Sequence, residues 1–69
     1  MIEIRVQPST SCFGAFFAWG KVGEITTDCP VKEPGEVWFN WADTHAEAFR
    51  KVHDEIEAHL NNSEVRGGL

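Results

Sequence analysis

The sequence predicts an α+β fold, in which an antiparallel sheet of three or four strands packs one face against a single C-terminal amphipathic helix. Two observations lead to this prediction. Short segments in which apolar and polar residues alternate lie between residues 2 and 41, and apolar residues then recur at helical spacing over residues 44–60. With 69 residues, the chain is expected to form one domain over residues 1–62, followed by a flexible tail over residues 63–69.

The first three strands are expected in the N-terminal half of the chain. The first covers residues 2–7, where aliphatic and polar residues alternate, and Pro8 ends it because proline cannot donate to the ladder. The second runs from Phe13 to Trp19 and is apolar on both sides, so one side must meet something other than the main core. A short third strand is expected over Glu24–Thr27, before a turn-rich stretch.

The fourth strand is expected from Glu36 to Trp41 and leads almost directly into the helix. It places three apolar side chains on one face and Glu36, Trp38 and Asn40 on the other. We expect the helix to cover the first of these faces. Trp38 then lies among polar neighbours, on the face that the helix leaves open.

The helix is expected over residues 44–60. Thr44 followed by Glu47 forms a capping box, which satisfies free amides in the first turn. Asn61 and Asn62 are expected to end the helix. The predicted core combines the apolar face of the helix with one face of the sheet: Ile2, Ile4, Val6, Phe13 or Phe17, Val37, Phe39, Phe49, Val52, Ile56 and Leu60.

Composition excludes several classes of function. The net charge of −5 and only six scattered Lys and Arg residues argue against direct binding to nucleic acid. The longest apolar run, Ala15–Trp19, is too short to cross a membrane, and no N-terminal signal segment is recognisable. Two distant cysteines fit reduced thiols in the cytoplasm. The expected partner is therefore another protein, or a second copy of the chain in a homodimer.

No catalytic or metal-binding signature is present. The cysteines and histidines do not have the short spacing of a zinc site, so neither metal nor cofactor is expected. No Ser-His-Asp order, phosphate loop or nucleophile elbow occurs, which favours a non-enzymatic protein. The alternative is a small metal-binding or thiol-dependent protein that uses Cys12, Cys29 and His45.

A protein-binding surface is expected around Trp38. Phe16 is its expected neighbour across the sheet, and Glu36 and Asn40 are expected to form a polar rim. Large aromatic residues on a face without a helix stay wet unless a partner covers them. The alternative is that the strand register differs by one residue, or that the third-strand region folds over these aromatics. A secondary candidate is the acidic outer face of the helix, formed by Glu47, Asp54 and Glu57, which would mimic nucleic acid.

The order of three strands and a helix, with Asp43-Thr44-His45-Ala46-Glu47-Ala48 at the start of the helix, resembles the N-terminal domain of HicB-like antitoxins. This resemblance covers about half of the chain, and here an extra aromatic strand precedes the helix and no DNA-binding domain follows it. It implies a partial double-stranded-RNA-binding-like fold that is used to bind protein. In size, acidity and lack of catalytic residues the chain is also similar to small phage proteins, including inhibitors of CRISPR systems. Both resemblances imply an inhibitor or antitoxin-type function.

Overall fold

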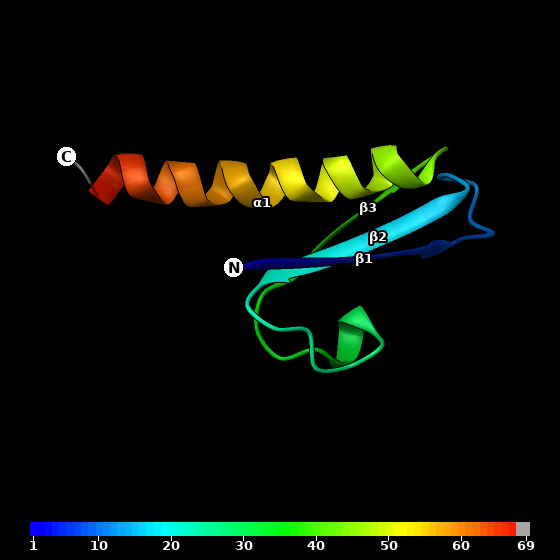
Figure 1. Ribbon diagram of the computed structural model, residues 1–69, viewed down its shortest axis with the longest axis horizontal. Coiled ribbons are helices and arrows are strands. Elements are labelled where there is room, and N and C mark those ends of the chain that lie inside the picture. The colour runs from blue at the N-terminus through cyan, green and yellow to red at the C-terminus, as the bar shows by residue number, and fades with distance from the viewer. Residues whose placement is uncertain (68–69) are drawn as a thin grey trace.

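The computed structural model describes residues 1–67, with side chains described through residue 62. It contains a three-stranded antiparallel sheet in the order β1-β2-β3 and one C-terminal helix, which confirms the predicted α+β fold. The elements are β1 (Ile2–Pro8), β2 (Phe16–Val22), β3 (Trp38–Ala42) and α1 (His45–Gly67). In Figure 1, α1 lies along one face of the sheet and extends beyond it at its C-terminal end.

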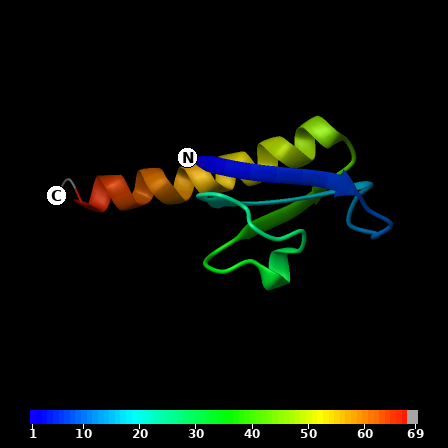
Figure 2. The same cartoon turned by 60° about the horizontal axis from the view of Figure 1, so that its bottom comes forward.

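The predicted third strand over Glu24–Thr27 is wrong. This segment belongs to a long loop between β2 and β3, which contains one short turn of 3-10 helix, η1 (Pro30–Lys32). The amides of Thr26 and Thr27 both donate to the carboxylate of Glu33, so a local contact takes the place of a strand ladder. The loop lies on the side of the sheet opposite α1 (Figures 1 and 2).

The helix begins as predicted, because the Thr44 hydroxyl oxygen accepts a hydrogen bond of 3.2 Å from the Glu47 amide. The prediction that Asn61 and Asn62 end it is wrong, since α1 continues to Gly67. Asparagine lowers helix stability by only about 0.7 kcal/mol relative to alanine, and neither Gly nor Pro follows until Gly67. Of the expected tail, residues 68 and 69 lie outside the described residues. No helix within the described range is apolar enough over a sufficient length to span a membrane.

Most of the core lies between α1 and one face of the sheet, while Trp19 of β2 is fully buried on the opposite face, across from Phe39. Ala18 and Ala42 from the sheet are buried against Ala48, Val52 and Ile56 of α1. The partly buried side chains around this cluster come from all three strands: Ile2, Ile4, Val6, Phe16 and Trp38. The predicted roles of the three aliphatic β1 residues, Val52 and Ile56 in the core are thus confirmed.

The predicted face of the sheet under the helix is wrong. Residues opposite each other across β2 and β3 share a face, and the Gly20–Trp38 and Phe16–Ala42 pairs lie on the face that α1 covers. The face that was expected to be buried, which carries Phe39, is the outer one. Alanines on both α1 and the sheet allow the helix to approach closely, and the aromatic residues of this face, Phe16 and Trp38, pack around the alanine cluster and are only partly buried.

The helix is also rotated relative to the prediction. Ala48 faces the sheet and is fully buried, whereas Phe49 and Leu60 are 43% and 39% exposed. These two residues were predicted to be core. They instead lie on the flank of α1, at the border between the core and solvent.

Candidate functional site

Aromatic side chains cluster on the outer face of the sheet, opposite α1. Phe17 of β2 lies directly across from Trp41 of β3, with ring centroids 5.0 Å apart. Phe39 contacts both, at 6.1 Å from Phe17 and 5.6 Å from Trp41. Phe13, from the loop between β1 and β2, lies 5.1 Å from Trp41 and is 71% exposed. The four rings form one continuous apolar surface.

This surface is hollowed into a groove of about 330 Å³ between the sheet and the loop that contains η1. Its lining is entirely apolar, and we call it the aromatic groove: Phe17, Pro30, Val31, Val37, Phe39 and Trp41. Val31 and Phe39 are 87% and 52% exposed. The groove therefore leaves large apolar side chains in contact with water.

One wall of the aromatic groove is fixed by the buried carboxylate of Glu33. Its side chain is fully buried and pairs with Lys21 Nζ at 3.0 Å. The amide and the hydroxyl group of Thr27 each donate to it at 2.8 Å, and the Thr26 amide donates at 3.0 Å. Lys21 also donates to the carbonyl oxygen of Pro34 at 2.9 Å. These bonds hold both ends of the loop against β2, so Pro30 and Val31 of the wall have a defined position.

The same cluster changes the acidity of Glu33. Burial raises the pKa of this carboxyl group, but the hydrogen bonds from Lys21, Thr26 and Thr27 outweigh it and lower the pKa from 4.5 to about 2. The ionised form is therefore the one that the folded loop stabilises.

This pKa predicts how stability depends on pH. Because the folded pKa lies below the unfolded value, Glu33 contributes stability that is fully present above pH 4.5 and is lost as pH falls toward about 2. We expect Glu33→Gln to melt several degrees lower at neutral pH, and its melting temperature to fall less than that of the unmodified protein over this window. Thermal melts of both proteins between pH 4.5 and about 2 measure this difference in melting temperature. The comparison isolates the effect of Glu33, because both proteins share all the other carboxylates. Parallel curves for the two proteins would contradict this role.

The residues predicted to bind a partner lie elsewhere than expected. Phe16 and Trp38 are on the helix-covered face: Phe16 packs against His45 at 6.0 Å, and Trp38 against His59 at 5.0 Å. They are not neighbours across the sheet, because Trp38 lies opposite Gly20 and Phe16 opposite Ala42. Their location on an open face is therefore a wrong prediction.

The predicted polar rim is divided as well. Glu36 is exposed and lines a hollow at the start of β3 with Trp38 and His59. Asn40 is half-buried on the helix side, where its side-chain oxygen accepts a hydrogen bond of 2.8 Å from the Trp41 amide. Only Glu36 and Trp38 of the four predicted residues are thus brought together in one hollow.

The aromatic groove was missed because Val37, Phe39 and, as an alternative to Phe13, Phe17 were assigned to the core. The sequence correctly grouped Phe39 with Trp41 on one strand face, and Phe13, although it lies in the loop before β2, contacts Trp41 beside Phe17. What the sequence did not reveal was which face meets the helix. The available signal was size, since Ala18, Ala42 and Ala48 offer a close-packed contact that the large aromatics do not.

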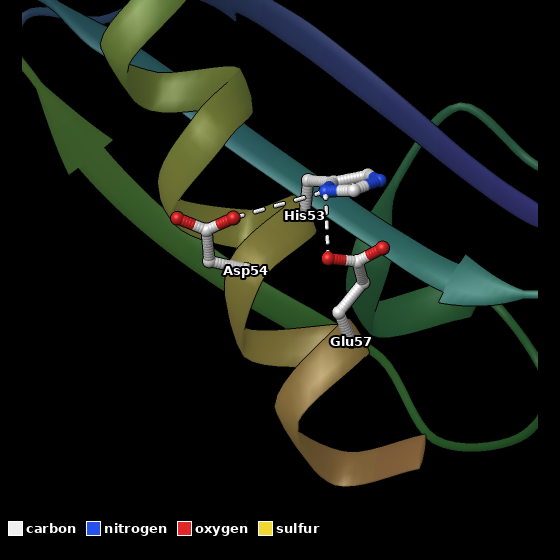
Figure 3. A group of neighbouring side chains, drawn as sticks. All are labelled: His53, Asp54 and Glu57. Atoms are coloured by element: carbon white, nitrogen blue, oxygen red, sulfur yellow. Dashed lines mark ion pairs between the residues drawn. The ribbon is translucent and has the colours of Figure 1, made fainter. Parts of the chain in front are cut away.

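The acidic outer face of α1 is exposed, as expected, at Glu47, Asp54 and Glu57. Figure 3 shows His53 beside the latter two carboxylates, with Nδ1 3.8 Å from Asp54 Oδ1 and 3.8 Å from Glu57 Oε1. Potential ligand atoms of these three residues lie within 4.8 Å of one another. Both carboxylates are largely exposed, at 66% and 56% of their side chains, which is typical of solvated charges on a helix.

The residues of the metal or thiol alternative are not brought together. Cys12 is exposed in the loop before β2, whereas Cys29 precedes η1 in the loop on the outer face. His45 begins α1 and packs on Phe16. Over the part of the chain that the structure describes, the one group of three or more potential ligands is the His53 group, and it contains none of these residues.

Comparison with known proteins does not add to this picture, because no protein-family model, curated protein or solved structure matches the chain. The aromatic groove is therefore the feature from which a function is inferred.

Proposed function

We propose that the protein is a small non-enzymatic binding module that covers a surface of another protein with its aromatic groove. In this proposal it acts as an inhibitor or antitoxin-type protein in the cytoplasm. The observation that carries the proposal is the groove, whose lining is wholly apolar and whose Phe39 and Val31 remain exposed. A contiguous apolar patch of this kind on a small domain is typical of a protein-interaction site.

The size and lining of the groove suit an apolar side chain of the partner as the anchor of the contact. A volume of about 330 Å³ accommodates one or two large side chains, and Phe and Trp walls bury much apolar area at little entropic cost. A second hollow shares Phe17 and Trp41 with the groove and is otherwise lined by the largely polar residues 7–11, at the end of β1 and just after it. An apolar centre with a polar border is the usual arrangement of a protein–protein interface.

The chemistry of the lining supports binding rather than catalysis. None of the six groove residues carries a titratable or nucleophilic group. The wall is rigid, because the buried Glu33 carboxylate and Lys21 fix the loop. A preformed surface loses little conformational entropy when a partner docks.

The test is affinity capture from the native host, with two variants compared with the unmodified protein. One variant is Trp41→Ala, which opens the groove, and the other reverses the charges at Glu47, Asp54 and Glu57 together. We expect a partner that the charge-reversed protein retains and Trp41→Ala loses, with circular dichroism showing that both variants are folded. If the charge-reversed protein alone loses the partner, the groove is not the binding surface and nucleic-acid mimicry by the acidic face becomes the better account.

A further inference from the structure

The two edges of the sheet are treated differently by the fold. β1 and β3 are both edge strands, because β2 lies between them. At the β3 edge, the Trp41 amide is satisfied by the Asn40 side chain at 2.8 Å, and the Trp41 carbonyl oxygen accepts a bond of 3.1 Å from Lys51 Nζ. Such side-chain contacts protect a sheet edge against pairing with another strand.

The β1 edge has no such protection. The Met1–Gly23 and Ser9–Ala15 bonds fix which β1 residues bond to β2, and the antiparallel alternation makes these the odd-numbered ones. The even-numbered residues Ile2, Ile4 and Val6 therefore direct their amides and carbonyl groups away from the sheet. Among the described groups, which include side chains only through residue 62, no side chain or loop bonds to these three residues.

The sequence of β1 favours pairing with itself. If two antiparallel β1 strands meet around Ile4, Ile4 pairs with its own copy and Ile2 pairs with Val6, so every outward-directed group finds a partner. The same register places Glu3 directly opposite Arg5 in both halves. Shifting the strands by two residues in either direction instead opposes Glu3 with Glu3 or Arg5 with Arg5, and like charges directly opposite are destabilising. One register therefore satisfies both the backbone and the charges.

Arg5 is available for this contact. It is exposed, and the ion pairs found among the described residues do not include it. One oxygen of Glu3 accepts the Ile25 amide at 3.1 Å, which leaves its second oxygen for an arginine.

An apolar side chain on the flank of α1 above β1 also lies beside this edge. Successive helix residues are rotated by about 100°, so Lys51 and His53 lie on opposite sides of the buried Val52. Lys51 reaches β3, and Figure 3 shows His53 on the other side, toward β1. Phe49 stacks on His53, with ring centroids 6.1 Å apart. The exposed Phe49 thus lies on the flank of α1 that borders the unprotected edge.

We propose that β1 pairs with β1 of a second copy of this chain, antiparallel around Ile4, and forms a continuous six-stranded sheet with both helices on one face. This interface is separate from the aromatic groove, which remains open on the opposite face. The proposal therefore does not depend on the function proposed above.

The test is sedimentation equilibrium of the full chain. The unmodified protein, the matched control Arg50→Glu on the outer side of α1, and the groove variant Phe39→Ala should all sediment at twice the chain mass of 7.8 kDa. Arg5→Glu and Glu3→Arg each oppose like charges and should raise the dissociation constant of the dimer about tenfold or more. An equimolar mixture of these two variants should recover the dimer, because unlike charges then meet in both pairs.

Rescue in the mixture depends on the register and not on the stability of either variant, and circular dichroism verifies that each is folded. A monomer at all concentrations up to the millimolar range, no rescue in the mixture, or equal weakening by Arg50→Glu would overturn the proposal. Loss of the dimer in Phe39→Ala alone would also overturn it, since the groove would then be the self-association surface.

Discussion

Ile56→Ala is expected to lower the free energy of unfolding by about 2–5 kcal/mol, enough to unfold much of so small a domain at physiological temperature. Ile56 lies on the side of α1 that faces the sheet and is fully buried in the cluster that includes Ala18, Ala42 and Ala48. Alanines have no side-chain freedom with which to fill the resulting cavity, which places the cost toward the upper end. Urea denaturation followed by circular dichroism measures it.

Phe49→Ala is the control for this prediction. Phe49 is the larger side chain, but it is 43% exposed, so its truncation should cost only about 1 kcal/mol. The comparison is made at the lowest workable chain concentration, so that self-association does not contribute. If Phe49→Ala proves as costly as Ile56→Ala, the rotation of α1 described above is incorrect.

Phe39→Ala is expected to weaken binding of the protein partner by about 2 kcal/mol or more while the fold stays intact. Phe39 is 52% exposed and contacts Phe17 and Trp41 along one wall of the aromatic groove. Its truncation removes apolar area that only the complex buries fully. The affinity is measured by titration calorimetry, and thermal melting verifies that stability is nearly unchanged.

Local features of the fold could be predicted from the sequence. The alternation in β1 identified its buried face, because Ile2, Ile4 and Val6 differ clearly from their polar neighbours. The capping threonine identified the start of α1, since Thr44 bonds within its own first turn. Each of these signals depends on residues a few positions apart, and each is confirmed.

The face of the sheet that meets α1 could not be predicted in the same way. β2 is apolar on both faces, so hydrophobic periodicity does not distinguish them. In β3 the face that α1 covers carries the polar Asn40, so periodicity favours the opposite face. Phe39 was assigned to the core because it shares an apolar strand face with Val37 and Trp41, whereas the fold uses Ala18 and Ala42 beneath the helix and leaves Phe39 exposed. Trp38, which the sequence pointed to as the anchor for a partner, packs on His59 instead. Truncating Trp38 should therefore affect folding more than binding.

The conformation of the loop between β2 and β3 depends on contacts that the sequence does not reveal. Lys21 and Glu33 are 12 positions apart, and their pairing is a consequence of the fold. The Thr26-Thr27 pair suits a strand by propensity, but its amides bind the Glu33 carboxylate. These contacts of Glu33 determine the position of the groove wall that carries Val31, so this wall could not be predicted without them.

The central claim, that the outer aromatic face rather than the helix side binds the partner, is tested most directly by one calorimetric series with the captured protein. The series compares Phe39→Ala with Phe49→Ala, because these phenylalanines are similarly exposed and lie on opposite sides of the molecule. We expect Phe39→Ala to lose about 2 kcal/mol or more of binding free energy and Phe49→Ala to lose less than about 0.5 kcal/mol. Equal losses, or a larger loss for Phe49→Ala, would contradict the assignment of the aromatic groove as the binding surface.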